Sequence, residues 1–325
     1  MEINPVEARQ NAAGPEKLTP AQLCAVFVLL LSFLAQAILS MRDDAPTFDE
    51  LINPSVGYAE LFTRDFGFIH DHPPLGRIVT ALPLLFLKPD LPPLQALSER
   101  GEESQVARYG FSNDFFYEAN DNADELLFWS RVPVVFLSLL LALAVFLWAR
   151  ELYGNYAGLF ALFLYCFEPN IIAHSRFTGK DLPVVLFTFL TIYLFWRYAR
   201  TPSVTNMVST GACLGLALLS KYSAIMLFPM LLVLAVLTPG RTSKRPFTTL
   251  VGVSAVAAAV IFLLYGTQWR IFASGVYNAV AHYQGTHPAF LMGEYSREGW
   301  WYYFPIAFLI KTPIPLLTFI ACALI

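Results

Sequence analysis

The chain has 325 residues, of which 56% are hydrophobic and only 14% are charged. Soluble domains carry roughly 25% charged residues, so this composition excludes an ordinary soluble fold and indicates that much of the surface faces lipid. The formal net charge of −3 gives no sign of a nucleic-acid partner.

The first apolar run extends from Ala21 to Met41, after a polar stretch that we expect to form a cytosolic tail over residues 1–20. The run matches the ~20 residues that a spanning helix needs. It exceeds the apolar core of a signal peptide, so we expect it to remain in the protein as a transmembrane helix.

Seven more apolar runs follow and predict an all-α polytopic membrane protein of about eight transmembrane helices. They cover roughly 128–149, 156–173, 182–198, 206–219, 222–237, 248–266 and 303–325. The split at Lys221 decides the orientation of every later helix. A lysine in mid-bilayer costs ~2.5–3.5 kcal/mol on insertion scales, so we expect one helix to end there and the next to begin.

Charge asymmetry orients these helices. With the N-terminus inside, the inner loops hold Arg150, Arg197, Arg200, Arg241, Lys244 and Arg245, with Glu151 as their only acid. The opposite side receives a long loop over 42–127, with sixteen of the 24 acidic residues. This bias fits the positive-inside rule. Shorter outer loops are expected at about 174–181 and 267–302, and all five histidines fall outside.

The long outer loop is expected to carry interfacial helices. Residues 50–63 have the apolar pattern of an amphipathic helix lying in the membrane interface. The stretch from Ile78 to Leu87 is apolar, short and flanked by prolines, which predicts an interfacial or re-entrant segment. No role follows from the sequence of the acidic insert 89–127.

Two motifs in this loop suit chemistry at a membrane surface. The carboxylates of Asp49 and Glu50 suit a general base or a divalent-metal site, with a solvated acidic loop as the alternative. The string from His70 to Arg77 contains a His-x-His pair and two prolines that fix a non-helical entry. Arg77 can hold a lipid phosphate, or it can be a snorkelling arginine after a rigid turn.

Three further groups of polar residues are expected on the outer side. The short loop from His174 to Asp181, which includes Arg176, has two interpretations. Its side chains line the outer mouth of the bundle, or its polar residues only mark the ends of two helices. Lys221 lies between two apolar runs, and an ionisable residue in such a place is a candidate functional residue. Lys311, several residues into the last apolar run, is a candidate for the same reason. The 267–302 loop, with Arg270 and His282, is rich in aromatic residues, which fit either an interfacial belt or a sugar-stacking site.

The four cysteines, Cys24, Cys166, Cys213 and Cys322, each lie inside an apolar run without metal-site spacing. We expect buried thiols and no disulfides. The sequence contains neither a Walker A string nor G-x-G-x-x-G. An enzyme that faces outward lacks a supply of nucleotide sugars, so a group-transfer donor would be a lipid.

Together these residues resemble a known enzyme group. The string His72-Pro73-Pro74-Leu75-Gly76-Arg77 is similar to the His-Pro-Pro-Leu-Gly-Lys string of the protein O-mannosyltransferases, with arginine for lysine. Asp49-Glu50 resembles the acidic pair in their first outer loop. Further similar segments are Phe128–Pro133, Trp148–Gly154, Glu168–Asp181, Leu218–Tyr222, Gly293–Tyr303 and Lys311–Pro313. The chain is identified as resembling the GT-C fold glycosyltransferases of the protein O-mannosyltransferase and aminoarabinose transferase group.

This resemblance implies transfer of a mannose-like hexose or related sugar from a polyprenyl-phosphate donor to a protein, lipid or glycan acceptor. The site would face the periplasm or exterior of a bacterial inner membrane. Asp49 would be the base, and Arg77, Arg176, Lys221 and Arg270 would stabilise the leaving phosphate. Glu50, Asp181, His72 and His282 would line the pocket. Asp49, Glu50, His72 and His282 are the candidate ligands for a divalent cation.

Relatives in this group are usually longer, whereas the chain ends at Ile325 inside an apolar run, so we expect the C-terminal part of the family to be missing. A secondary transporter is the main rival function; it would place polar residues near mid-membrane within inverted repeats. A second rival function is that of a non-catalytic membrane assembly subunit. The enzyme hypothesis requires the Asp49 turn, the loop to Asp181 and Lys221 to share one outer pocket.

Overall fold

The computed structural model describes residues 16–42, 44–69, 71–98, 103–238, 246–282 and 288–324. Every apolar run forms helix within these ranges, which confirms the predicted helical membrane-protein class. The bundle consists of α2 (Pro20–Met41), α7 (Ala123–Tyr153), α8 (Asn155–Phe167), α9 (Pro169–His174), α10 (Asp181–Arg200), α11 (Val204–Ser220), η3 (Tyr222–Met226), α12 (Leu227–Leu237), α14 (Pro246–Tyr265), η4 (Gly266–Gln268), α15 (Trp269–His282), α16 (Tyr303–Lys311) and α17 (Ile314–Ala323).

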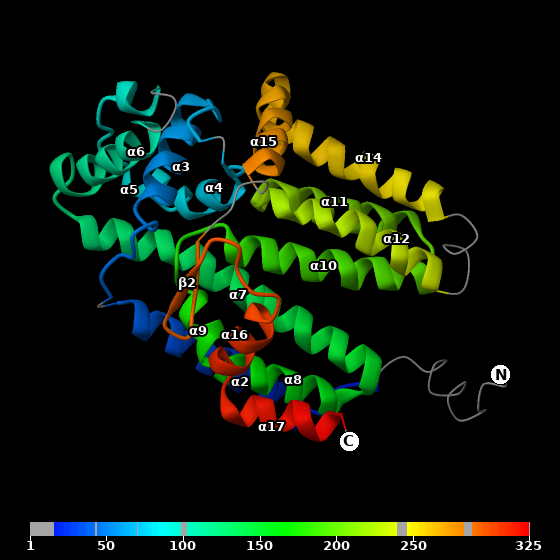
Figure 1. Ribbon diagram of the computed structural model, residues 1–325. Coiled ribbons are helices and arrows are strands. Elements are labelled where there is room, and N and C mark those ends of the chain that lie inside the picture. The colour runs from blue at the N-terminus through cyan, green and yellow to red at the C-terminus, as the bar shows by residue number, and fades with distance from the viewer. Residues whose placement is uncertain are drawn as a thin grey trace.

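A cap of short helices is inserted between α2 and α7. It consists of α3 (Ile52–Thr63), α4 (Leu75–Ala81), α5 (Leu84–Leu87), η1 (Leu94–Ser98), α6 (Glu103–Asn113) and the π-helical turn η2 (Asp114–Glu118). Figure 1 shows the cap gathered over the end of the bundle at which α7 begins, while α10, α11, α12 and α14 run side by side.

Several of these helices have the length and composition to cross a membrane, which makes the chain a multi-pass membrane protein. Among the described residues, the helices that meet both criteria are Pro20–Met41, Ala123–Tyr153, Asp181–Arg200 and Phe247–Ala279. A fifth candidate is the pair α16–α17, which bends by 115° at its break. The remaining apolar helices, Asn155–Phe167, Val204–Ser220 and Tyr222–Leu237, are shorter.

Most of the differences from the expected helices have local causes. The run 156–173 breaks before Pro169, where the Glu168 carboxylate caps α9 by accepting a 2.6 Å hydrogen bond from the backbone N–H of Ile171. The last run breaks before Pro313. A small hairpin, β1 (Ala289–Leu291) with β2 (Glu294–Ser296), lies inside the 267–302 loop, so the chain is not purely helical.

The expectation of an interfacial helix over 50–63 is wrong for α3. All residues of this helix from Pro54 to Glu60 are buried, because α4 and α6 pack on it. The 78–87 stretch forms α4 and α5, which meet at Pro83 and leave Phe86 exposed at the edge of the cap. The cysteine expectation holds for disulfides, since all four thiols are free, but Cys24 and Cys322 are exposed on helix surfaces rather than buried.

Close helix approach in the bundle depends on small residues. Gly211 of α11 faces α14 so closely that a Cβ atom there would lie 2.5 Å from the Cβ of Val256. Such contacts let membrane helices pack by van der Waals attraction, since lipid supplies no hydrophobic drive between them. Phe195, Leu214 and Leu231 fill the core where α10, α11, α12 and α14 meet.

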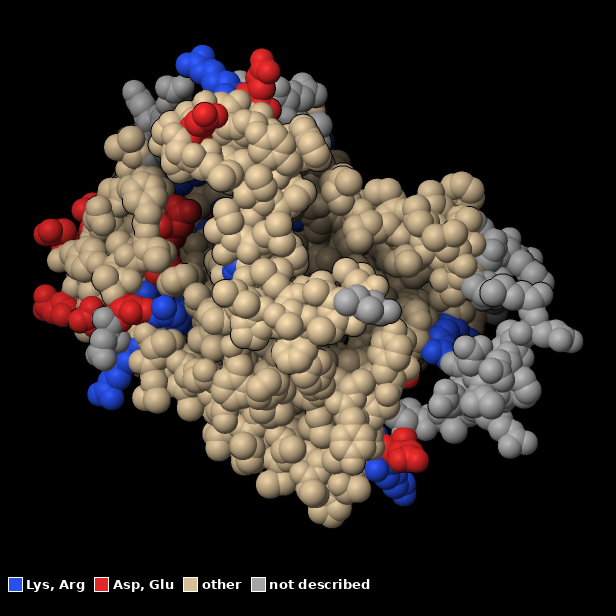
Figure 2. Space-filling view, turned by 60° about the horizontal axis from the view of Figure 1, so that its bottom comes forward, with Lys and Arg blue, Asp and Glu red and all other residues tan. Residues whose placement is uncertain are grey.

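Charge is distributed as an oriented membrane protein requires. Arg150 lies in the last turn of α7, and Arg197 and Arg200 lie in the last turn of α10, at the end of the bundle away from the cap. Figure 2 shows a broad surface with few charged residues; most of the acidic residues in this view lie along its left edge, with others at the top and the lower right. The predicted N-terminal tail up to residue 15 and the basic residues at 241, 244 and 245 lie outside the described residues.

The crossing of α3 and α4 gives a stability prediction. A Cβ added to Gly57 would lie 2.2 Å from the backbone oxygen of Arg77, so Gly57→Ala must push the two helices apart. Overpacking of this kind costs about 1–3 kcal/mol, and we expect the melting temperature in detergent to fall by several degrees. Gly110→Ala in α6 is the matched control, because nothing lies within 4 Å of its added Cβ. Equal melting temperatures for the two variants would contradict the prediction.

Candidate functional site

A buried ion pair fixes the turn that carries the acidic pair. The Glu50 and Arg131 side chains are each 1% exposed, and the Nε and Nη2 atoms of Arg131 donate to the two carboxylate oxygens at 3.0 and 2.9 Å. Arg131 also donates to the backbone oxygens of Met41 and Asp44 at 3.0 and 2.9 Å. The end of α2 and the following turn are therefore tied to α7, and Glu50 is occupied by structural contacts.

The same turn holds the loop between α9 and α10. The hydroxyl of Thr178 donates to the backbone oxygen of Glu50 at 2.8 Å. The Asn53 amide donates to the backbone oxygens of Asp49 and Thr178 at 3.0 and 3.2 Å. Residues more than 120 positions apart in the sequence are thereby held together, which brings Lys180 beside the Asp49 turn.

A cavity of about 200 Å³ opens at this junction. It is lined by Asp49, Ile52, Asn53, Ile69, Asp71, His72, Pro73, Arg77, Arg108, Tyr109 and Lys180. Pockets for drug-sized ligands are roughly 300–1,000 Å³, so this one suits a small polar group such as one sugar ring. The structure thus brings together three residues that the sequence singles out for the site: Asp49, His72 and Arg77.

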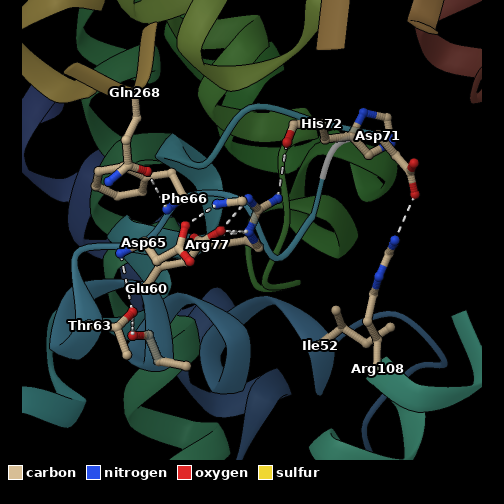
Figure 3. A network of polar contacts seen from close by, with 12 residues as sticks. Ile52, Glu60, Thr63, Asp65, Phe66, Asp71, His72, Arg77, Arg108 and Gln268 are labelled. Atoms are coloured by element: carbon tan, nitrogen blue, oxygen red, sulfur yellow. Dashed lines mark hydrogen bonds and ion pairs between the residues drawn. The ribbon is translucent and has the colours of Figure 1, made fainter. Parts of the chain in front are cut away.

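Arg77 is neutralised by a partner that the sequence analysis did not identify. Its Nη2 lies 2.6 Å from Glu60 Oε1, its Nε donates to both Glu60 oxygens, and both residues are buried (Figure 3). Its Nη1 donates to the backbone oxygen of His72 at 3.2 Å. Arg77 therefore anchors the His72 segment onto α3, and its positive charge at the cavity is largely offset by Glu60.

Burial and neighbouring cations make His72 a weak base. Burial, with Lys180 and Lys221 nearby, lowers the pKa of His72 to about 4. Burial is also the main cause of a lowered pKa for Lys180, and Asp181 acts in the opposite direction. His72 is neutral at pH 7 and can act as a hydrogen-bond acceptor or donor in the cavity wall.

The predicted break at Lys221 is confirmed. Helix α11 ends at Ser220, Lys221 has an extended backbone, and η3 begins at the next residue. The Lys221 ammonium lies 2.7 Å from an Asp181 oxygen, next in sequence to the cavity residue Lys180. The acidic turn, the loop to Asp181 and Lys221 therefore meet at the same end of the bundle, but Asp181 and Lys221 do not line the cavity itself.

The other proposed phosphate-binding cations lie outside the cavity lining. Arg176 forms an ion pair with Asp44, donates to the Ser40 backbone oxygen at 2.8 Å and stacks over Phe177, with 5.2 Å from its guanidinium carbon to the ring centroid. Arg270 is exposed and lies over the Trp269 ring. The His282 side chain, His70 and His287 lie outside what the structure describes.

The proposed metal ligands do not gather into one cluster. Within the described ranges, no three His, Cys, Asp or Glu side chains are arranged to hold a metal ion. Glu50 is paired with Arg131, and the side chain of His282 lies outside what the structure describes.

Sequence reasoning missed the roles of Arg131, Glu60, Lys180 and Tyr109. Arg131 gave a signal: it is a charged residue near one end of a long apolar run. Glu60 lay inside an expected interfacial helix, and no feature of the sequence indicated its ion pair with Arg77. Tyr109, whose hydroxyl donates to Asp49 at 3.0 Å, comes from the insert to which the sequence assigned no role.

Comparisons with known proteins bear on the family and the fold of the chain. Residues 124–265 match a protein family described as dolichyl-phosphate-mannose-protein mannosyltransferase. Dolichyl-phosphate-mannose–protein mannosyltransferase 1 of Schizosaccharomyces pombe is 24% identical over 281 residues, which make up 84% of this chain and 29% of that protein. The S. cerevisiae protein O-mannosyltransferase Pmt1–Pmt2 complex bound to the sugar donor has a TM-score of 0.56 and 20% identity, covering 82% of this chain and 36% of that chain.

The chain thus spans about a third of the length of the relatives it matches. The structural likeness, at 20% identity, concerns the fold. The family match confirms the resemblance that the motifs indicate, and it begins at residue 124, after the cap. The Asp49 turn and α6 lie outside that match.

The Glu50–Arg131 pair gives a second stability prediction. Arg131→Met leaves a buried carboxylate without its partner, which we expect to cost about 3–5 kcal/mol in the free energy of unfolding. Glu50→Gln combined with Arg131→Met should cost less, because no unpaired charge remains. Arg197→Met is the control, since its 3.8 Å ion pair with Glu151 is partly exposed and is expected to contribute below ~1 kcal/mol. An Arg131→Met variant that unfolds no more easily than Arg197→Met would contradict this prediction.

The lowered pKa of His72 predicts acid sensitivity. An unfolded histidine binds a proton below about pH 6.5, whereas His72 in the folded protein does so only below about 4. The unfolded chain therefore holds more protons between these values, and stability falls as the pH is lowered through this window. His72→Gln should flatten the melting temperature against pH between about 6.5 and 4, and the exposed His174→Gln should not. Parallel curves for wild type and His72→Gln would refute this.

Proposed function

We propose that this chain, a distant homologue of the protein O-mannosyltransferases, transfers a sugar from a polyprenyl-phosphate donor to a hydroxyl group on the extracytoplasmic face of a membrane. One observation carries the proposal: an Asp49 carboxylate and the Lys180 ammonium line one small cavity at the capped end of the bundle. A base for the acceptor and a cation for the leaving phosphate are the two groups that such a transfer needs.

The proposed reaction is a single displacement. Asp49 takes the proton of the acceptor hydroxyl while that oxygen attacks the anomeric carbon of the donor sugar. The bond from the anomeric carbon to the phosphate oxygen breaks, and the lipid phosphate leaves with the negative charge. Lys180 and Lys221 stabilise this charge, and the configuration at the anomeric carbon is inverted.

An apolar groove next to these lysines fits the lipid part of the donor. It has a volume of about 410 Å³ between α10 and the η3–α12 segment. Its lining includes Val184 and Val185, one turn along α10 from Asp181, and Ser223 and Ala224, just after Lys221. A polyprenyl chain lying here would leave its phosphate beside the lysines and its sugar near Asp49.

The other predicted residues take two kinds of role in this proposal. Glu50 and Arg77 hold the cavity walls in place through Arg131 and Glu60. Arg176 and Arg270 remain proposed donor contacts outside the cavity lining, and His282, whose side chain lies outside what the structure describes, remains a proposed pocket residue. The sugar is a mannose-like hexose, and the acceptor is a protein hydroxyl, with lipid and glycan acceptors as alternatives that the assay separates.

The proposed topology has eight crossings with the N-terminus inside. Four helices support this count by length and composition, and the shorter apolar helices and the bent α16–α17 pair supply the others. This orientation puts the cap and cavity outside, in a bacterial inner membrane facing the periplasm or exterior. The arginines at the far ends of α7 and α10 support it.

Asp49→Asn tests the proposed function. The variant keeps the shape of the side chain but cannot accept the acceptor proton, so we expect transfer from dolichyl-phosphate-linked mannose to a serine- and threonine-rich peptide to fall at least 100-fold. The melting temperature should stay near that of wild type, because Asp49 is exposed. Wild-type turnover by Asp49→Asn would reject Asp49 as the base. Uptake of a solute along an ion gradient by wild-type proteoliposomes, without transfer, would favour a transporter.

A further inference from the structure

The cavity has a wall that none of the family motifs supplies. Helix α6 contributes Arg108 and Tyr109 to the lining and lies in the insert 89–127. The hydroxyl of Tyr109 donates to an Asp49 oxygen at 3.0 Å. The Tyr109 ring also packs against Phe48, with 4.3 Å between ring centroids. Both contacts fall on the turn that presents the proposed base.

From these contacts we propose that Tyr109 is a positioning residue for Asp49 and that α6 forms the acceptor-side wall of the cavity. The inference rests on the proposed function. The Glu50–Arg131 pair fixes the backbone of the turn, but it leaves the Asp49 side chain free to rotate. The phenol removes that freedom, holding one carboxylate oxygen so that the other is presented to an acceptor hydroxyl.

The wall itself is firmly attached. The hydroxyls of Ser55 in α3 and Ser112 in α6 lie 2.9 Å apart in a buried contact. Phe111 packs in a buried cluster with Val56 and Ala59 of α3. Arg108 forms a 2.9 Å ion pair with Asp71, so α6 also holds the segment before His72 (Figure 3). A helix anchored on two sides of the cavity orients a side chain better than a mobile loop would.

The phenol is suited to donate a lasting hydrogen bond. Burial, with Asp49 next in importance, raises the pKa of Tyr109 to about 12. Tyr109 therefore stays protonated at any working pH and remains a donor to Asp49. The acceptor proton then goes to the oxygen of Asp49 that Tyr109 does not hold, and Tyr109 itself gains or loses no proton in the reaction.

The decisive comparison is Tyr109→Phe against Tyr117→Phe, in the full chain in detergent. With dolichyl-phosphate-linked mannose and the serine- and threonine-rich peptide, we expect Tyr109→Phe to lower kcat about 10- to 100-fold, because the base loses its fixed orientation. The donor KM should change less than about twofold, since the substitution removes only a hydroxyl whose partner is Asp49 rather than a lysine. Tyr117→Phe, an exposed tyrosine in η2 with no contact to Asp49, should match wild type.

A second measurement does not depend on turnover. In protein labelled at the tyrosine ring carbons, the NMR signal lost in Tyr109→Phe identifies Tyr109, and its titration can be followed toward high pH. Asp49→Asn removes the carboxylate that helps to raise the pKa of Tyr109, so the midpoint should fall below that of wild type, although burial still keeps it raised. Asn53→Ala, which removes hydrogen bonds to the backbone oxygens of Asp49 and Thr178 but leaves the Asp49 carboxylate in place, should leave the Tyr109 hydroxyl paired.

The outcomes separate the two hypotheses. Transfer by wild type with an unchanged kcat in Tyr109→Phe would overturn the positioning role and leave the proposed function intact. A loss confined to KM, or a Tyr109 titration that Asp49→Asn does not move, would also overturn it. Absence of transfer by wild type would overturn the proposed function and the positioning role together, even with the Tyr109–Asp49 contact confirmed by titration.

Discussion

The architecture of the candidate site depends on one buried contact, the ion pair between Glu50 and Arg131. Both side chains are 1% exposed, and the guanidinium also binds the backbone oxygens that follow α2. Desolvating two charges is expensive, and only near-complete hydrogen bonding offsets that cost. The pair therefore specifies one arrangement of α2, α7 and the Asp49 turn, because any other would leave a charge buried without its partner.

Two adjacent carboxylates consequently have different environments and different uses. Glu50 points into the protein and is saturated by Arg131 and by the backbone N–H of Thr47 at 2.8 Å. Asp49 points to the cavity, where its described side-chain contact is the Tyr109 hydroxyl. A saturated carboxylate cannot exchange partners during a reaction without a large penalty, whereas an open one can. Of the two adjacent acidic residues, Glu50 is therefore structural, and Asp49 is the one whose carboxylate is available for chemistry.

The sequence predicted the bundle well because lipid imposes simple rules. Apolar runs must be helices, and the cost of Lys221 in the bilayer correctly predicted the break after Ser220. The cap was harder, because the burial of α3 arises from Gly57, α4 and α6 meeting around it, which no periodicity in residues 50–63 reveals. The lining of the cavity was predicted in part: Asp49 and His72 follow from their motifs, whereas Tyr109 and Lys180 reach the cavity only through tertiary contacts.

Most charges at the cavity are paired, which leaves Lys180 and Asp49 as the opposite charges in its lining. Glu60 offsets Arg77, Asp71 pairs with Arg108, and His72 is neutral at pH 7. The lowered pKa of Lys180 means that its ammonium is held at some cost in this partly buried place, near the Lys221–Asp181 pair. In the proposed reaction, an anion beside Lys180 would relieve that cost, and it would do so most when the anomeric bond breaks and the phosphate gains charge. The same electrostatics that disfavour an empty site would therefore favour the transition state over the bound donor.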